Sequence, residues 1–78
     1  MSELLIWITN KMGEKFQIIC KSTDTVLELK KIIALYRNTD WRRMNLIKNS
    51  VYLIDFLTLE DYEINNESCI ECVDSLNM

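Results

Sequence analysis

The sequence contains no proline, no histidine and a single glycine among its 78 residues. No stretch has the composition of a linker, so the length predicts a single domain spanning residues 1–78. No apolar run approaches the ~18 residues of a membrane span, and the N-terminus lacks the basic and apolar regions of a secretory signal. The net charge of -3 disfavours a broad phosphate-binding surface. We therefore expect a soluble intracellular protein without direct nucleic-acid contact.

The absence of histidine also limits the chemistry of the three cysteines. Cys69 and Cys72 form a C-x-x-C pair, but residues three apart on a strand face opposite sides, with Cα atoms roughly 10 Å apart. A disulfide needs Cα atoms within about 7 Å. With Cys20 elsewhere in the chain, no zinc site is complete and no thiolate has an activating base. We expect Cys20 and Cys72 to be buried, Cys69 to be exposed, and the protein to hold no metal or cofactor and not to be an enzyme.

What the sequence does contain is one long helical segment, residues 24–38. Thr25 is placed to be the N-cap, and Glu28 three residues later completes an S/T-x-x-E capping box. At 100° per residue, one face of this helix is apolar and is expected to pack against the rest of the domain. It carries Val26, Leu29, Ile33 and Tyr36. The cations are expected on the flanks or toward the C-terminal half, where the dipole favours them; they are Lys30, Lys31 and Arg37.

The rest of the chain alternates apolar and polar residues at the spacing of strands. Residues 4–9 and 15–21 predict a hairpin around a turn at residues 10–13, and Phe16, Ile18 and Cys20 face inward. After the helix we expect strands at residues 44–48 and 51–54, a helical turn within 57–64, and a last strand at 68–74 with Ile70 and Cys72 inward. This order predicts an α+β fold of the β-grasp class, with one helix across a mixed sheet and an ordered core from about residue 4 to 74.

Several of these residues resemble the ubiquitin superfamily, in the same order and at the same spacing. They are Asp24-Thr25-Val26, Leu46-Ile47, Thr58-Leu59-x-Asp61-Tyr62-x-Ile64 and Glu67-Ser68. The chain is more similar still to the homologous-to-ubiquitin family of splicing modifiers, also called ubiquitin-like protein five. That resemblance rests on Gly13, Cys20, Asp24, Leu29-Lys30-Lys31, Ile33 and Asp61-Tyr62-Glu63-Ile64. In this fold the turn tyrosine has a structural role, so Tyr62 is expected to bond its hydroxyl to nearby backbone while Asp61 stabilises the same turn.

The resemblance implies function through a binding surface. Members of the family bind, without covalent attachment, a short helical element called HIND in a protein of the spliceosomal tri-snRNP, and so modulate pre-mRNA splicing. It implies that Asp24 is the charged anchor, forming a salt bridge to an arginine of that element. The alternative is that Asp24 only favours the helix N-terminus, worth about 0.3–1 kcal/mol; both roles are compatible. Expected with this are a monomer in nucleus and cytoplasm, and a splicing helicase as a further candidate partner.

Apolar neighbours are needed for most of the affinity. Ile32 is expected toward the edge of the helix and Ile19 on the outward face of the second strand. With Tyr36, they are candidates to line a groove between helix and strand that fits an amphipathic helix. The alternative is that they are peripheral core, which is favoured for Tyr36 and evenly balanced for the other two. A second apolar patch is expected on the open face of the sheet; it consists of Leu5, Trp7, Ile47 and Val73.

The end of the sequence separates two classes of ubiquitin-like function. A conjugated modifier needs a terminal Gly-Gly, whereas this chain has no glycine after Gly13 and differs from the resembled family at residues 73–74, where that family has paired tyrosines. Conjugation is therefore disfavoured. The alternatives kept open are a covalently conjugated modifier and a ubiquitin-like interaction module of the ubiquitin–proteasome system.

Overall fold

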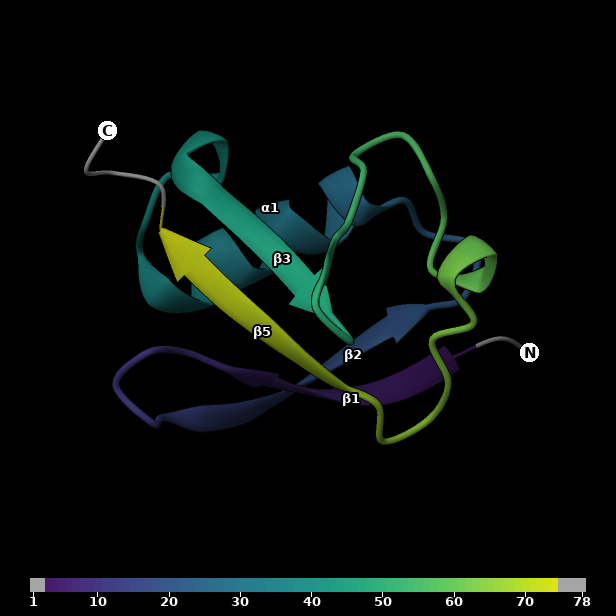
Figure 1. Cartoon of the computed structure of the whole chain (residues 1–78), viewed down its shortest axis with the longest axis horizontal. Helices are drawn as coiled ribbons and strands as arrows, with labels where there is room; N and C mark the ends of the chain where they lie inside the picture. Colours follow the sequence, from purple (N-terminus) through teal and green to yellow (C-terminus); the bar gives the residue numbers. More distant parts are fainter. Residues whose placement is uncertain (1–2, 75–78) are drawn as a thin grey trace.

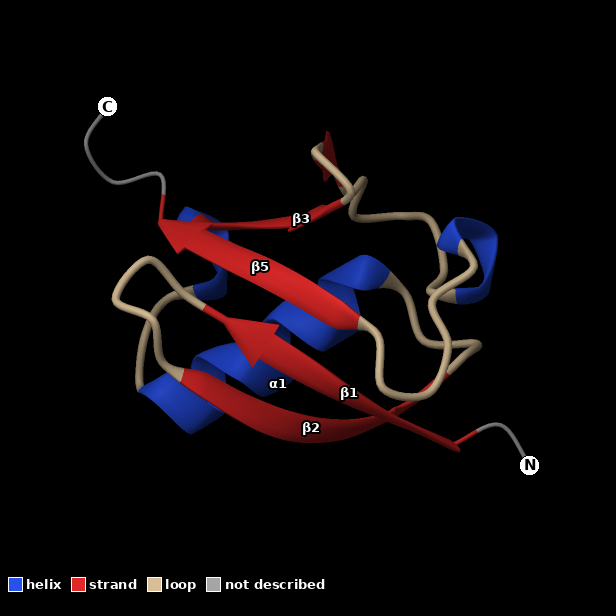
Figure 2. Cartoon of the chain, turned by 60° about the horizontal axis from the view of Figure 1, so that its bottom comes forward, coloured by secondary structure: helices blue, strands red, loops and turns tan. Residues whose placement is uncertain are grey.

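The computed structural model describes residues 3–74, which fold into a five-stranded mixed sheet with one long helix across one face (Figures 1 and 2). The strands are β1 (Glu3–Thr9), β2 (Lys15–Lys21), β3 (Met44–Lys48), β4 (Val51–Tyr52) and β5 (Cys69–Asp74). The helices are α1 (Val26–Arg37) and two 3-10 turns, η1 (Trp41–Arg43) and η2 (Glu60–Tyr62). The strand order is β2-β1-β5-β3-β4, with β1 and β5 parallel and the other pairs antiparallel. The predicted β-grasp is confirmed.

The core lies between α1 and the sheet face that it covers. The strands bury alternate residues there, as the pattern predicted, namely Ile6, Ile8, Ile18, Cys20, Leu46 and Ile70. From α1, Val26, Leu29 and Ile33 are fully buried against them. Tyr36 does not join this group, because its side chain is 63% exposed; the prediction that it belongs to the core is wrong.

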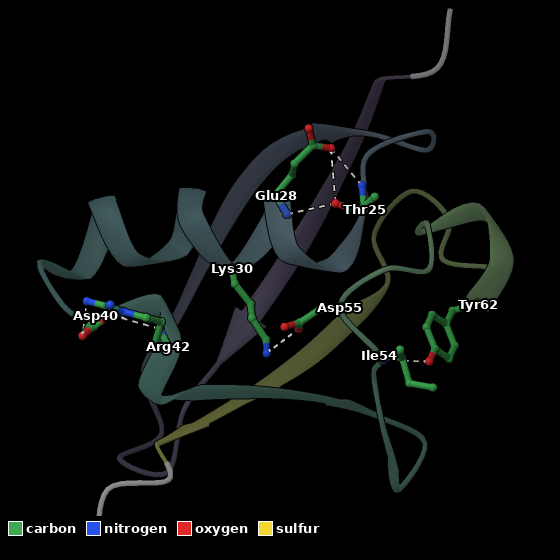
Figure 3. A network of polar contacts seen from close by, with 8 residues as sticks. All are labelled: Thr25, Glu28, Lys30, Asp40, Arg42, Ile54, Asp55 and Tyr62. Atoms are coloured by element: carbon green, nitrogen blue, oxygen red, sulfur yellow. Dashed lines mark hydrogen bonds and ion pairs between the residues drawn. The ribbon is translucent and has the colours of Figure 1, made fainter.

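The start of α1 is fixed by side-chain and long-range backbone hydrogen bonds. The Thr25 hydroxyl accepts from the Glu28 N–H at 3.2 Å, and Glu28 Oε1 accepts from the Thr25 N–H at 3.0 Å, which is the predicted capping box (Figure 3). The next two amides bond to the loop after β4: Val26 N–H to Leu57 O and Leu27 N–H to Asp55 O. All the donors that a helix N-terminus leaves unpaired are thus satisfied within the domain.

The segment after β3 departs most from the prediction, which placed a strand at residues 51–54. β4 ends at Tyr52, although the Leu53 N–H still donates to Leu46 O at 2.9 Å. From Ile54 the chain leaves the sheet and turns toward α1. There the carbonyls of residues 55 and 57 accept hydrogen bonds from the first amides of the helix. Two left-handed residues, Asn49 and Ser50, make the preceding tight turn.

The turn tyrosine behaves as the sequence indicated. Tyr62, at the end of η2, accepts a hydrogen bond on its hydroxyl from the Ile54 N–H at 2.8 Å (Figure 3). Asp61 accepts from the Thr58 N–H, and the Thr58 hydroxyl accepts from the Asp61 N–H, so the two residues close the same turn. Asp40 similarly caps η1 through the Arg42 N–H, and that bond lowers the pKa of Asp40. None of the helices within residues 3–74 is both long and apolar enough to cross a membrane.

Candidate protein-binding site

Asp24 lies in the short turn between β2 and α1, next to the capping box but outside it. Its Oδ2 accepts a hydrogen bond from the Lys21 N–H at 3.0 Å, and its carbonyl accepts from the Leu59 N–H. The side chain is half-exposed. Because Thr25 and Glu28 satisfy the helix, the Asp24 carboxylate is anchored by one oxygen and remains accessible to a cationic partner.

At the other end of α1, Tyr36 stacks on an aromatic neighbour. Its ring stacks on that of Phe16 near the start of β2, with the two ring centres 5.8 Å apart. The Arg37 guanidinium also lies over the Phe16 ring, 5.5 Å from its centre. Arg37 also forms a salt bridge to Glu14 at 2.9 Å; hydrogen bonds from Asn10 and Arg37 lower the pKa of the Glu14 carboxyl. These side chains surround an open hollow that is accessible to a partner.

The structure divides the four predicted docking residues between two faces. Ile32 is half-buried against the core on α1, and Asp24 and Tyr36 lie near the two ends of that helix. Ile19 is 65% exposed, but it alternates with Ile18 and Cys20, which face α1, and it pairs with Leu5 of β1. Ile19 therefore points to the opposite face of the sheet, and the expected grouping with Ile32 and Tyr36 is not seen.

That opposite, open face carries an apolar surface spread over several strands. The register brings Ile19 beside Leu5, and Ile47 beside Tyr52. Trp7 is half-buried beneath the Lys15 ammonium, which lies 4.9 Å from the centre of the Trp7 ring. The residues that the sequence placed in this patch, Leu5, Trp7, Ile47 and Val73, are all half-buried on it, and the structure adds Ile19 and Tyr52. The sequence does not predict the position of Tyr52, because residues 51–54 are all apolar and no alternation shows which face is buried.

A buried ion pair lies beneath α1 that sequence reasoning also missed. Lys30, expected on a flank of the helix, is 7% exposed, and its ammonium lies 2.6 Å from Asp55 Oδ1 (Figure 3). The partner comes from the loop after β4, 25 residues along the chain, so no helical spacing signals the pair. The pair joins the loop after β4 to α1.

The cysteines are arranged largely as expected. Cys20 is buried, Cys69 is exposed, and Cys72 is half-buried at the edge of the core; no disulfide joins them. Burial, with a smaller contribution from the negative charge of Asp24, raises the pKa of the Cys20 thiol to about 11. Within residues 3–74, no group of three His, Cys, Asp or Glu side chains gathers in a metal-binding arrangement.

Comparison with known proteins identifies the family. The ubiquitin family matches residues 6–77. Ubiquitin-like modifier HUB1 of Eremothecium gossypii is 34% identical over 64 residues, covering 82% of this chain and 88% of that protein. HUB1 of Debaryomyces hansenii is 39% identical over 57 residues, with coverages of 73% and 78%, and ubiquitin-like protein 5 of Drosophila melanogaster is 32% identical over 66 residues, with 85% and 90%.

A solved structure agrees with these relatives. The ubiquitin-like domain of an Arabidopsis thaliana protein, determined by solution NMR, superposes with a TM-score of 0.88 at 25% identity, covering 96% of this chain and 80% of that one. The fold and the sequence thus lead to the same assignment. The chain belongs to the ubiquitin family and is, within it, a divergent member of the group formed by the HUB1 modifiers and ubiquitin-like protein 5.

Proposed function

We propose that this protein is a ubiquitin-like adaptor that binds a HIND-type helical element of a spliceosomal tri-snRNP protein without covalent attachment, and thereby modulates pre-mRNA splicing. The observation that carries the proposal is the state of Asp24: its carboxylate is half-exposed and released from helix capping by Thr25 and Glu28. A carboxylate held by one hydrogen bond is pre-oriented to receive an arginine. Membership in the HUB1 group supports a ubiquitin-like modifier, and the partner class is the one that the family resemblance implies.

The apolar part of the contact is proposed for the exposed side of α1. Ile32 and Tyr36 would pack against the apolar face of the partner helix, with the Phe16 ring supporting Tyr36 from below. A splicing helicase is a second protein of this pathway that we propose as a partner. The corresponding locations are the nucleus and cytoplasm, and the acting form is a monomer.

The test is an NMR titration of the ¹⁵N-labelled protein with a HIND-type helical peptide. We expect shifts in α1 and around residue 24, and loss of binding in Asp24→Arg. Asp24→Asn keeps an acceptor for the Lys21 N–H and is expected to weaken binding about tenfold. Glu71→Arg, on the open sheet face, is the matched charge control and should bind normally. Unchanged affinity in a folded Asp24→Arg protein contradicts the proposal.

The apolar surface of the open sheet face favours a second candidate, a ubiquitin-like interaction module of the ubiquitin–proteasome system. In that case Trp7→Ser and Ile47→Ser would reduce recovery of ligase or proteasome components in an affinity pulldown, whereas Asp24→Arg would not. Covalent conjugation is tested separately by incubation with activating enzymes and ATP. A thioester on this chain would replace the non-covalent proposal.

A further inference from the structure

Exposed apolar side chains cluster in the turn that follows β4. Phe56 is 80% exposed, and Ile54 and Leu57 are also exposed. All three follow the end of β4 at Tyr52 and lie outside the strand pairings of the open sheet face. The Leu57 N–H donates to Ile54 O at 3.1 Å, so residues 54–57 form a hydrogen-bonded turn. Such a turn brings its first and last Cα atoms within about 7 Å. We call Ile54, Phe56 and Leu57 the apolar turn.

The backbone of the apolar turn is held at nearly every residue. The Ile54 N–H donates to the Tyr62 hydroxyl, and the carbonyls of residues 55 and 57 accept from the first amides of α1. The fourth side chain of the turn, Asp55, points to Lys30 and is partly exposed (Figure 3). A rigid backbone that presents apolar side chains to water loses little conformational entropy on binding. Exposed apolar side chains grouped on such a backbone are expected of an interaction surface.

The part of the chain that carries the apolar turn has charged residues of one sign. No lysine or arginine occurs after Lys48, whereas the remaining residues include seven acids: Asp55, Glu60, Asp61, Glu63, Glu67, Glu71 and Asp74. Two exposed acids, Glu60 and Asp61, follow the turn closely in the chain, and Asp61 bonds to Thr58. A third exposed acid, Glu28, comes directly after Leu27, whose N–H donates to Asp55 O. Lys30, the cation in contact with the turn, is buried and paired. The surface is therefore apolar with an acidic border.

We propose that the apolar turn is a second docking surface, and that it binds a cationic amphipathic helix of another protein. Charge complementarity selects lysine and arginine at the flanks of the partner and apolar residues at its centre. The turn amides of residues 54 and 57 are already bonded, so the partner must be recognised through side chains, as a helix allows and an added strand does not. This surface is separate from α1's outer side and does not depend on the splicing proposal.

The probe is a synthetic helical peptide with leucine on one face and lysine on the other, titrated into the ¹⁵N-labelled protein. We expect shifts concentrated at residues 54–61, binding that weakens with added salt, and no binding of the same peptide with glutamate in place of lysine. Phe56→Ser is expected to weaken binding at least about tenfold. Leu35→Ser, which removes an 84% exposed side chain of α1, is the matched control and should stay within about twofold.

Several outcomes would overturn the proposal. They are shifts located elsewhere, equal binding of the glutamate peptide, and native affinity in Phe56→Ser with an unchanged NMR spectrum elsewhere. Sedimentation equilibrium addresses the other occupant: self-association that Phe56→Ser abolishes would assign the surface to a second copy of this chain. Since Phe56 is largely exposed, its replacement is not expected to unfold the domain.

Discussion

The buried ammonium of Lys30 in α1 forms an ion pair of 2.6 Å with Asp55, in the loop that carries the apolar turn. The ammonium is almost completely removed from water, whereas Asp55 is partly exposed. Removing one partner of a fully buried pair costs ~3–5 kcal/mol, because the other charge is left without compensation. The exposure of Asp55 reduces that cost here.

We predict that Asp55→Ala lowers the free energy of unfolding by about 2 kcal/mol, since the Lys30 ammonium then remains buried without a partner. Lys30→Met combined with Asp55→Ala should recover part of that loss, because no buried charge remains. Urea unfolding followed by circular dichroism measures both. Lys30→Met alone completes the comparison. If the losses of the two single variants add up to the loss of the double variant, the two side chains are not energetically coupled.

Thr25→Ala removes the N-cap hydroxyl and is predicted to destabilise the protein by about 1 kcal/mol. Thr25→Ser keeps an oxygen that can accept from the Glu28 N–H and should lose much less. Thermal unfolding of the two variants, compared at one temperature, is the measurement. Equal stability of the alanine and serine variants would exclude the hydroxyl as the cause.

Tyr62→Phe leaves the Ile54 N–H without its partner while keeping the ring, so we predict a loss of about 1–2 kcal/mol. Faster amide hydrogen exchange at residue 54 should accompany it. Tyr36→Phe is the control, because the Tyr36 side chain is exposed and stacks through its ring. If Ile54 exchange is unchanged in Tyr62→Phe, the hydroxyl does not hold this loop.

The raised pKa of the Cys20 thiol leads us to predict that the free energy of unfolding falls at alkaline pH. Its pKa in the folded protein is raised to about 11 from an ordinary value near 9, so the unfolded chain loses its proton first. The stabilisation is complete below about pH 9 and is lost as the pH rises toward about 11. Native protein should therefore lose more unfolding free energy across this window than Cys20→Ala does, as measured by urea unfolding at each pH. Parallel curves for the two proteins would contradict the assignment.

The parts of the fold that local patterns describe were predictable. The capping box of Thr25 and Glu28 marked the start of the helix, and the alternation in β1, β2 and β5 identified the buried face of each strand. The burial of Lys30 was not predictable in the same way, because it depends on a loop residue that only the tertiary fold brings near. The exposure of Tyr36 follows from its stacking on Phe16 at the margin of the core, which helical spacing does not encode.

The candidate site shows the same division. The release of Asp24 from capping could be read from its position before Thr25. The outward position of Ile19 was predictable from its alternation with Ile18 and Cys20. Its grouping with residues of α1 in one groove was wrong, because a side chain on the outward face cannot face the helix. The apolar turn could not, because residues 51–54 have the pattern of a strand and the chain leaves the sheet after Tyr52 to supply carbonyls to α1.

The carbonyls of Asp55 and Leu57 accept hydrogen bonds from the first two amides of α1. These bonds fix the loop after β4 to the beginning of the helix, so a shift of one is expected to shift the other. Asp24 lies immediately before the N-cap residue Thr25, and its carbonyl accepts a hydrogen bond from the Leu59 N–H. A shift of the helix start would therefore also shift the Asp24 carboxylate. An insertion or substitution at residues 55–57 that shifts the carbonyls would move the acidic anchor as well. A substitution in this loop is therefore expected to change the affinity for a helix bound at Asp24 without removing any contact that Asp24 makes to it.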